Sequence, residues 1–263
     1  MISMEDHTFV IPAYKDSTFI EECIVSLKNQ TRKSHICIIT STPSKYLQDV
    51  AQRFSLPLVV NMDSKGIAGD WNFALAQAKT TWVTIAHQDD IYESTFLQKV
   101  LQKTNKKNVL IFFTDYCEII HGRTRRHSLN FFIKKILLFP FLIKPCIKNR
   151  FFRRLPLVFG NAVCCPSVTF NKPGLKDFTF SPDFSYSLDW KAWLDMTNRE
   201  GAFIFINKKL MKHRIHKDSE TTKQLGTNVR KKEELRIFRI IWGKRVAGLL
   251  GRIYTLSHKD NIL

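Results

Sequence analysis

The chain has 263 residues, of which 44% are hydrophobic and 24% charged, an ordinary globular balance with ample length for a core. No apolar run approaches the ~20 residues that a membrane-spanning helix needs, and residues 1–7 lack the apolar core of a signal peptide. The formal net charge of +18 indicates an anionic partner: a nucleic acid, a phosphate-rich substrate or an acidic membrane face.

Strand and helix patterns alternate through the first half of the chain. Apolar runs predict strands at residues 8–11, 35–39, 58–60, 82–86 and 109–113. Helical spacing predicts a helix from residue 17 and others over residues 44–54, 70–78 and 94–102, with a turn at 66–69. This alternation predicts an α/β fold with a mostly parallel central sheet and helices on both faces.

The second half is less regular. Its patterns predict strands at residues 163–170 and 202–206 and a helix over residues 188–196. Residues 229–254 form a long basic helical pattern, which we expect to break at one of three glycines: Gly243, Gly248 or Gly251.

Charges and cysteines are unevenly placed. Residues 119–176 contain no Asp or Glu, whereas Lys and Arg recur throughout this stretch. The six cysteines form no CxxC pair and several lie in apolar runs, so we expect reduced thiols in a cytosolic protein. A redox role is open to adjacent Cys164 and Cys165, but packing in a strand is the simpler interpretation.

Two adjacent carboxylates, Asp89 and Asp90, follow the predicted strand 82–86. Burying such a pair is costly unless it is neutralised or binds a metal, and open α/β sheets bind their ligands at this carboxyl edge. Mg²⁺ is commonly held by one or two carboxylates together with substrate phosphates. Because the chain has neither GxGxxG nor GxxxxGK(S/T), phosphate binding would need such a metal. The alternative is that the pair caps the next helix.

Four segments occur in an order and spacing that resemble a known family. They are VIPAY at residues 10–14, SLKNQT at 26–31, GIAGDWN at 66–72 and the Asp89-Asp90 pair. Together they resemble a family-two glycosyltransferase with the GT-A fold over residues 8 to about 118. The resemblance implies inverting transfer of a sugar from a nucleotide-diphosphate donor to a hydroxyl acceptor, with Mn²⁺ or Mg²⁺ as cofactor.

The resemblance assigns the donor side of the site. Pro12, Ala13 and Tyr14 would line the pocket for the nucleobase and ribose. Asp89 would lie near the donor ribose and sugar and beside the metal, and Asp90 would hold the metal on the diphosphate. The alternative is that Pro12 only ends a strand and Tyr14 only packs there.

The chain departs from the family pattern at other donor positions. Its second strand ends at Thr40 and Ser41 where the family has Asp-Asp-Gly-Ser, so their hydroxyls are the expected replacements for the nucleobase-binding Asp. Asp70 and Asn72 flank a Trp where the family has Arg, and both remain donor-binding candidates. The donor identity stays open, with a UDP-sugar as the first expectation.

An inverting transfer needs a general base beside the acceptor hydroxyl. The family takes it from a Glu-Asp pair at the start of a helix, and Leu188-Asp189 occupies that place, so Asp189 is the candidate base. The alternative is that Asp189 caps its helix while Trp190 and Trp193 form a packing face. Asp183 is the second candidate base.

Residues 213–222 (HRIHKDSETT) resemble the RxHxxSxT segment with which the family closes over the donor. In this segment Arg214 would face the diphosphate and His216 would complete the metal shell. A solvent-exposed loop histidine is the alternative, and a zinc site is disfavoured because no paired cysteines are near. His87 stands in place of the first acid of the family's DxDD, without an assigned role.

Residues 129–143 are strongly apolar and are followed by basic residues. The charge-free part, 136–143, is too short to span a bilayer, and we expect a helix in the membrane interface with basic side chains on anionic headgroups. A buried helical hairpin covering the sheet is the alternative. The basic C-terminal pattern is a second candidate membrane face, with a solvated helix face as its alternative.

These inferences divide the chain into four parts: a nucleotide-sugar-binding half (1–118), a membrane-interface insertion (119–158), an acceptor-binding half (159–225) and a C-terminal helical extension (226–263). We expect a peripheral enzyme at the cytoplasmic face of the cell membrane. Its acceptor would be a polyprenyl-diphosphate-linked saccharide in the assembly of capsule, exopolysaccharide or O-antigen. Resemblance at Gly160-Asn161 and PSVTF, residues 166–170, supports this setting.

Two other classes of function stay open. A non-catalytic scaffold could keep the fold after losing donor binding, as the donor-side departures suggest. A nucleic-acid-binding module would account for the charge, but no such motif is present, and we expect no nucleic acid as a partner.

Overall fold

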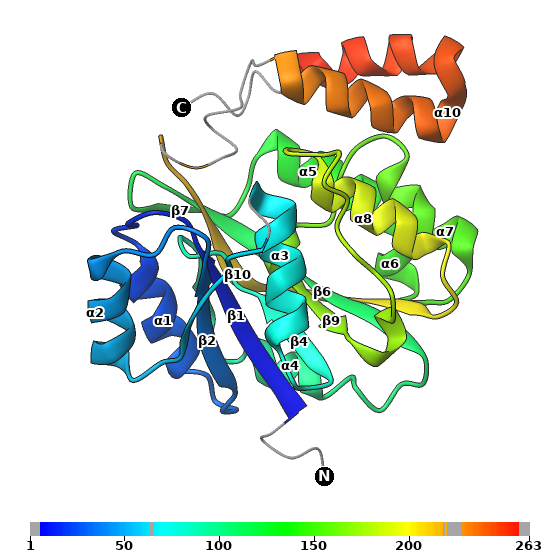
Figure 1. The fold of residues 1–263 in the computed structure, drawn as a ribbon. Helices are drawn as coiled ribbons and strands as arrows, with labels where there is room; N and C mark the ends of the chain where they lie inside the picture. The colour runs from blue at the N-terminus through cyan, green and yellow to red at the C-terminus, as the bar shows by residue number, and fades with distance from the viewer. Residues whose placement is uncertain (1–5, 64–65, 218, 220–227, 258–263) are drawn as a thin grey trace.

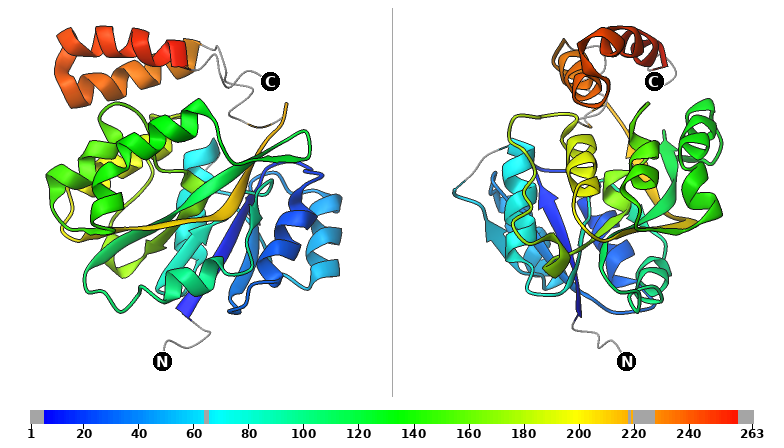
Figure 2. Two further views of the ribbon diagram at one scale, coloured as in Figure 1. Left: turned by 180° about the vertical axis from the view of Figure 1, so that it is seen from behind. Right: turned by 90° about the vertical axis from the view of Figure 1, so that its right-hand side faces the viewer.

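The structure is a computed structural model that describes residues 6–63, 66–217, 219 and 228–257 (Figure 1). A central sheet carries helices on both faces, and a helical hairpin lies beyond one end of it (Figures 1 and 2). The predicted α/β fold with a central sheet is therefore confirmed. The expected boundary between residues 225 and 226 lies outside the described residues.

The described strands form one ten-stranded sheet with the main order β3-β2-β1-β4-β9-β6-β10-β5, while β7 pairs with β6 and β8 with β10. The strands are β1 (His7–Ala13), β2 (His35–Thr40), β3 (Leu58–Val60), β4 (Trp82–Ile85), β5 (Ile91–Tyr92), β6 (Val109–Ile120), β7 (Arg123–Arg125), β8 (Cys146–Ile147), β9 (Val168–Asn171) and β10 (Ala202–Ile215).

Strands β1 to β4 are parallel to one another, as are β6 and β10, and β9 runs antiparallel between β4 and β6. Because β1, β2 and β4 are parallel, the loops after Ala13, Thr40 and Ile85 leave the same edge of the sheet. This edge carries the candidate site.

The helices are α1 (Ile20–Lys28), α2 (Lys45–Phe54), α3 (Gly66–Gln77), α4 (Phe96–Leu101), α5 (Leu129–Leu137), α6 (Phe139–Ile143), α7 (Arg150–Arg154), α8 (Leu188–Thr197) and α10 (Asn228–Ser257). Side chains alternate along β1, so Phe9 and Ile11 face the core beneath α1, α2 and α4, while Val10 faces the core beneath α3 and α8. These two apolar layers hold the helices on the sheet.

Four elements differ in extent from the prediction. Helix α3 begins at Gly66, where φ is +85°, so the expected turn at residues 66–69 is already helical. A 3₁₀ turn at Cys165–Ser167 precedes β9, because Pro166 cannot donate to a ladder. Strands β6 and β10 continue beyond their apolar parts to Ile120 and Ile215, where they pair with each other.

The C-terminal element is a helical hairpin. The helical backbone of α10 is interrupted at Gly243, whose φ of +74° and ψ of 172° turn the chain back. Of the three glycines expected to break this helix, the first does so. Phe238 in the first half of α10 is buried edge-on against Trp190 of α8, with ring centroids 5.2 Å apart. Within the described residues, no helix is long and apolar enough to cross a membrane.

Candidate active site

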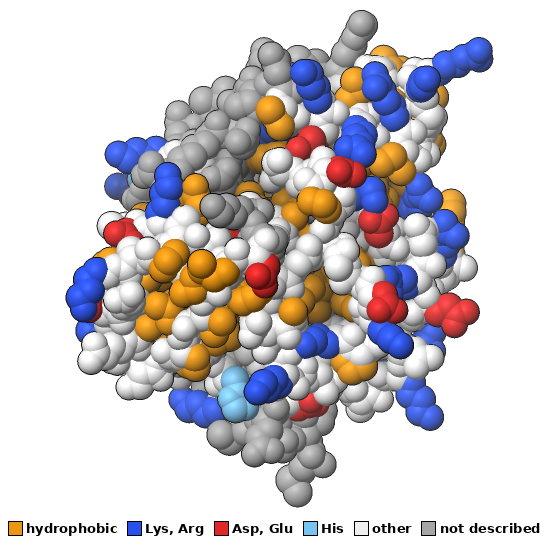
Figure 3. Space-filling view, viewed as in Figure 1, with side chains coloured by type: hydrophobic (Ala, Val, Ile, Leu, Met, Phe, Trp, Pro, Cys, Tyr) orange, Lys and Arg blue, Asp and Glu red, His pale blue; other side chains and the backbone are white. Residues whose placement is uncertain are grey.

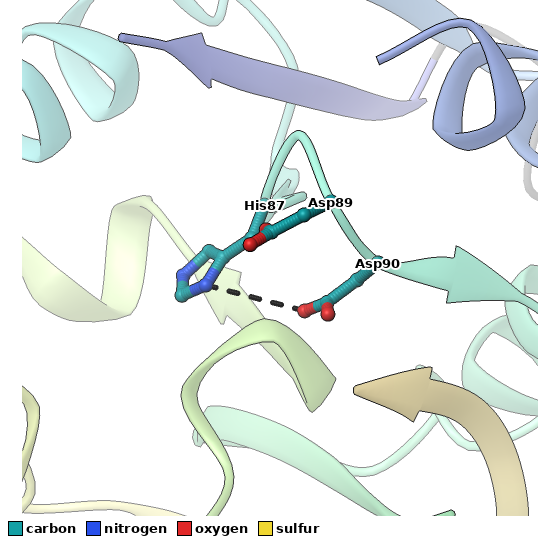
Figure 4. A group of neighbouring side chains, drawn as sticks. All are labelled: His87, Asp89 and Asp90. Atoms are coloured by element: carbon teal, nitrogen blue, oxygen red, sulfur yellow. Dashed lines mark ion pairs between the residues drawn. The ribbon is translucent and has the colours of Figure 1, made fainter. Parts of the chain in front are cut away.

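The candidate metal centre lies in the loop after β4. The backbone N–H of Asp90 donates to the carbonyl oxygen of His87 at 3.1 Å, closing a turn. Figure 4 shows the side chains of His87, Asp89 and Asp90 gathered at this turn. One candidate ligand atom from each of the three lies within 4.8 Å of the others, so the turn assembles two carboxylates and an imidazole.

Asp90 is fully buried and is held from β10. Its Oδ1 accepts the backbone N–H of Arg214 at 2.9 Å, and His213 Nδ1 lies 3.0 Å from the same oxygen. Burial by itself lowers the pKa of His213, but the charge and hydrogen bond of Asp90 raise it to about 9. His213 is therefore a cation at neutral pH, and it offsets the buried carboxylate.

Asp89 is stabilised from the same strand and the residues after it. His216 Nε2 lies 2.9 Å from Asp89 Oδ2, and Arg214 Nε donates to the Asp89 carbonyl oxygen at 2.9 Å. Burial raises the pKa of Asp89, but the hydrogen bond with His216 and the charges of the nearby histidines outweigh it and leave the pKa below its ordinary value. Asp89 is thus ionised at neutral pH.

The residues present fit a divalent cation. His87 Nδ1 lies 4.0 Å from Asp90 Oδ2, so the imidazole offers a nitrogen ligand beside the two carboxylates. Burial lowers the pKa of His87, which keeps its imidazole in the neutral form that binds metals. The predicted ligand pair Asp89 and Asp90 lies in this group. His216 is engaged with Asp89, and its role as a metal ligand stays a prediction.

Tyr14, the residue after β1, is hydrogen-bonded to Gln88 in the loop after β4 (residues 87–90, the metal loop). Gln88 Oε1 accepts the backbone N–H of Tyr14 at 3.3 Å, and Gln88 Nε2 donates to the Tyr14 carbonyl oxygen at 3.1 Å. Tyr14 itself is exposed, whereas Pro12 is half-buried and Ala13 buried. The exposed ring therefore stands on a backbone that is fixed relative to Asp89.

The other predicted donor residues fall into two groups. Ser41 Oγ and Asn61 Nδ2 donate to the two oxygens of Asp70, each at 2.9 Å, which joins the end of β2 to the start of α3. Thr40 is fully buried, and its hydroxyl accepts a backbone N–H within its own turn. Asn72 exchanges two hydrogen bonds with the backbone of Phe180. Their donor contacts stay predictions.

The side chain of Arg214, on β10, contacts protein groups on α1 and just before it. Its guanidinium pairs with Glu22 and lies 4.4 Å from the ring centroid of Phe19. Arg214 also contacts Asp89 and Asp90, so it helps to fix the position of the loop after β4. Its predicted contact with a diphosphate stays a prediction.

Asp189 lies in the first turn of α8. Asn161 Nδ2 donates to its Oδ2 at 2.7 Å, and the backbone N–H of Trp190 donates to its Oδ1 at 2.7 Å. Burial raises the pKa of Asp189 to about 6, and these hydrogen bonds only partly oppose it. Trp190 and Trp193 are buried in the core, as the packing alternative expected. Asp183 is exposed, and its Oδ2 lies 3.6 Å from Nη2 of Arg236.

The thiols of Cys164 and Cys165 feel the charges of both candidate acids. Burial raises the pKa of both thiols, and the charges of Asp90 and Asp189 each raise it further. The Tyr92 hydroxyl donates to the carbonyl oxygen of Pro166 at 2.7 Å, which fixes the 3₁₀ turn at Cys165–Ser167 against β5. Segment 161–166 is therefore hydrogen-bonded to Asp189 through Asn161 and to Tyr92, two residues after Asp90.

Sequence reasoning missed several contributors. His213 opens the segment 213–222 but had no expected role, although as the neighbour of Arg214 it was a candidate for the same site. Gln88 and Glu22 make contacts that depend on tertiary structure, and their spacing carried no signal, whereas Asn161 lies in a segment of family resemblance but had no assigned contact. His87 departs from the family pattern, and its substitution for an acid was the usable clue.

Comparison with known proteins agrees with this geometry. The sequence profile of the family described as Glycosyl transferase family 2 matches residues 8–171. Uncharacterised glycosyltransferases of Rickettsia typhi and Rickettsia prowazekii are 25% and 24% identical to this chain over 232 and 234 residues. These alignments cover 82% and 83% of this chain but 65% and 67% of the relatives, so the chain spans about two thirds of their length.

Solved structures are similar in fold. The crystal structure of S. aureus TarS 1-349 in complex with UDP-GlcNAc has 14% identity and a TM-score of 0.65, covering 98% of this chain and 73% of that one. The mannosyltransferase PcManGT from Pyrobaculum calidifontis, in complex with GDP-Man and Mn²⁺, has 13% identity and a TM-score of 0.60, covering 96% and 74%. Both are GT-A glycosyltransferases. With the profile match running from β1 to β9 of a GT-A fold, the chain belongs to glycosyl transferase family 2.

Proposed function

We propose that the protein is an inverting glycosyltransferase that moves a sugar from a nucleotide-diphosphate donor to a lipid-linked saccharide. The proposal is supported by segment 161–166, which is hydrogen-bonded to Asp189 through Asn161 and to Tyr92, two residues after Asp90, through Pro166. Asp90 belongs to a group that fits a divalent cation, and Asp189 has a pKa suited to a base. An inverting transfer needs both functions within reach of one sugar.

The donor would bind along the carboxyl edge of β1, β2 and β4. Tyr14, with Pro12 and Ala13 beneath it, offers an exposed aromatic ring for a nucleobase, and the Ser41–Asp70 pair offers polar atoms for the base or ribose. Mn²⁺ or Mg²⁺ held by the metal loop would neutralise the diphosphate as the nucleotide departs. A UDP-sugar is our first choice, since TarS is solved with UDP-GlcNAc.

Asp189 would act on the acceptor. Its carboxylate takes the proton of the acceptor hydroxyl as that oxygen forms a bond to the anomeric carbon, on the face opposite the diphosphate. The bond from the anomeric carbon to the diphosphate breaks, and its electron pair leaves with the nucleotide. Asn161 and the backbone N–H of Trp190 each hold one carboxylate oxygen and so fix the orientation of the carboxylate. A pKa of about 6 leaves the base ionised at neutral pH yet able to accept a proton.

An apolar ridge on the helical insertion supports a membrane-borne acceptor. Its exposed side chains are Leu129, Phe132, Ile133 and Ile136 of α5, Phe139, Leu142 and Ile143 of α6, and Phe151 and Phe152 of α7. Phe132 and Ile143 are 63% and 69% exposed. Monomeric proteins rarely leave so many large apolar side chains together in water, and such a ridge is typical of a membrane-interface helix.

Basic residues accompany the ridge. Lys144, Lys148 and Arg150 are exposed beside it, whereas Lys134 and Lys135 turn toward Tyr116 and Asp115 of β6. Figure 3 shows further Lys and Arg side chains over α10. We propose that this surface rests on anionic headgroups at the cytoplasmic face of the membrane. The acceptor would then be a polyprenyl-diphosphate-linked saccharide used in bacterial capsule, exopolysaccharide or O-antigen assembly.

The transfer reaction can be tested with purified protein, Mn²⁺, a panel of UDP-, GDP- and dTDP-sugars, and polyprenyl-diphosphate-linked saccharides in detergent micelles. We expect one donor class to glycosylate the lipid-linked acceptor and not the same saccharide without lipid. Equal transfer to the free saccharide would refute the lipid-linked acceptor. No transfer from any donor by a folded sample would favour the scaffold alternative.

Membrane binding has a separate test. We expect the protein to float with phosphatidylglycerol vesicles and less with phosphatidylcholine vesicles, and the double variant Phe132→Ser/Ile136→Ser to bind at least about tenfold more weakly. Val25→Ser removes an exposed apolar residue of α1, away from the ridge, and serves as the control. Equal loss in both variants, or no vesicle binding by the unaltered protein, would contradict the assignment of the ridge.

A further inference from the structure

Three consecutive backbone amides before α8 donate to one carboxylate from the C-terminal hairpin. Glu233 of α10 accepts the N–H of Ser185 at 2.8 Å on Oε1, and those of Tyr186 and Ser187 at 2.9 and 2.8 Å on Oε2. Glu233 is buried. Both of its oxygens are therefore committed to the segment that immediately precedes Asp189.

This contact fixes the N-cap residue of α8 from outside the helix. Ser187 is the N-cap residue of α8, but its side chain makes no capping hydrogen bond, and its hydroxyl is buried without a partner. Backbone N–H groups at a helix start need acceptors, and a carboxylate is favoured there by the helix dipole. Glu233 accepts the N–H of the N-cap residue Ser187 itself, from 46 positions later in the chain.

Other side chains of α10 contact the same segment. The guanidinium of Arg230 lies 4.5 Å from the ring centroid of Tyr186, and that of Arg236 lies 4.6 Å from the ring centroid of Phe184. Phe238 packs on Trp190, one residue after the candidate base. The first half of α10 thus contacts the chain on both sides of Asp189, in addition to the three hydrogen bonds of Glu233.

We propose that Glu233 is a positioning residue for Asp189, fixing the segment 185–187 so that α8 begins where it presents the carboxylate to the acceptor hydroxyl. The C-terminal hairpin then contributes to the acceptor site through the contact of Glu233 with residues 185–187. This inference rests on the proposed role of Asp189 as the base, but the contact itself is testable without any activity.

Hydrogen exchange of the full chain tests the contact first. In Glu233→Ala we expect the amides of residues 185–187 to exchange about tenfold faster or more, because hydrogen bonds to a charged group are lost. Glu233→Gln, which keeps the side-chain shape and one acceptor oxygen, should give a smaller increase. Glu234→Gln, a neighbouring buried carboxylate paired with Arg230, is the matched control and should leave these amides protected. Unchanged exchange in both Glu233 variants would overturn the proposal.

Kinetics then separate positioning from simple stability. We expect kcat to fall about 10- to 100-fold in Glu233→Ala and less in Glu233→Gln, with the donor KM within twofold of the unaltered protein, because a displaced base slows only the chemical step. Unchanged kcat despite faster exchange would also overturn the proposal. If the unaltered protein transfers no sugar at all, the proposed function fails, while the exchange experiment still decides whether Glu233 fixes the segment.

Discussion

The donor and acceptor regions each contain a candidate aspartate, Asp89 and Asp189, but in opposite environments. Asp89 is surrounded by three histidines, and its pKa lies below the ordinary value. Asp189 has one side-chain partner, Asn161, and burial raises its pKa to about 6. Environments that push the pKa values of two carboxylates apart commonly assign them different chemical roles.

The contrast explains which acid can do which task. A carboxylate whose charge is already stabilised is a weak proton acceptor but a suitable ligand for a cation. A sparsely stabilised carboxylate with a pKa just below neutrality accepts protons readily. The donor region, with Asp90 also held by β10, is therefore suited to binding charge, and the acceptor region to proton transfer.

The substitution with the largest expected effect removes the candidate base and leaves the donor-binding residues intact. Asp189→Asn should lower kcat about 10²- to 10⁴-fold, since the amide cannot take the acceptor proton. Nucleotide binding should stay within twofold, because the donor residues are untouched. Steady-state kinetics and calorimetry on the same sample measure both. A parallel loss of nucleotide binding would show that the two regions are not separate.

A substitution at His87 is expected to lower the Mn²⁺ affinity of the donor side. His87→Ala should weaken Mn²⁺ binding in the presence of UDP by about 10²-fold, because the nitrogen ligand beside Asp89 and Asp90 is lost. His87→Asp, which restores an oxygen ligand, should recover part of that loss. The exposed His35→Ala is the control, and Mn²⁺ titration followed by electron paramagnetic resonance is the measurement. Equal Mn²⁺ affinity in His87→Ala would remove His87 from the metal group.

The pH dependence of kcat tests the role of Asp189 separately from that of the donor side. Asp189 acts in its deprotonated form and has a pKa of about 6, so activity is retained above that pH and lost as the pH falls through it. Between pH 7 and pH 5 we expect kcat to fall about tenfold, from the ionised fraction of such a base. The residual activity of Asp189→Asn should lack this acid limb. An identical limb in that variant would assign it to another group.

The smallest effect concerns the end of β2. Ser41→Ala removes one of the two hydrogen bonds from protein side chains to Asp70, and we expect the Kd for UDP to rise about three- to tenfold, as one modest hydrogen bond would. Calorimetric titration measures this directly. No change in Kd would place Ser41 outside the donor pocket and leave its contact with Asp70 a purely structural one.

The donor region was largely predictable from the sequence, because its strands are short apolar runs and its candidate ligands directly follow one of them. Asp89 and Asp90 could be placed at the carboxyl edge of the sheet by this argument alone. The partners that compensate them could not, since His213 and Arg214 arrive on a strand whose polar second half gave no apolar signal. The pairing of β10 with β6 extends the strand there.

The acceptor region was harder to predict for the same physical reason. Asp189 was found through a family position, but its hydrogen bond to Asn161 and the contact of Glu233 with the start of α8 are tertiary contacts between distant segments. The strand expected at residues 163–170 was wrong in its first part, where Pro166 imposes a 3₁₀ turn. That segment is hydrogen-bonded to Tyr92 on the donor side and to Asp189 on the acceptor side, so the least regular segment joins both halves of the site.

Calorimetric binding of UDP with and without Mn²⁺, to the unaltered protein, Asp90→Asn and Asp189→Asn, tests the central claim most directly. The account predicts Mn²⁺-dependent binding that is lost in Asp90→Asn and kept in Asp189→Asn, with GDP and dTDP as alternative nucleotides if UDP does not bind. Binding that survives in Asp90→Asn, or disappears equally in both variants, would contradict the division of the site into a charge-binding acid and a proton-accepting acid.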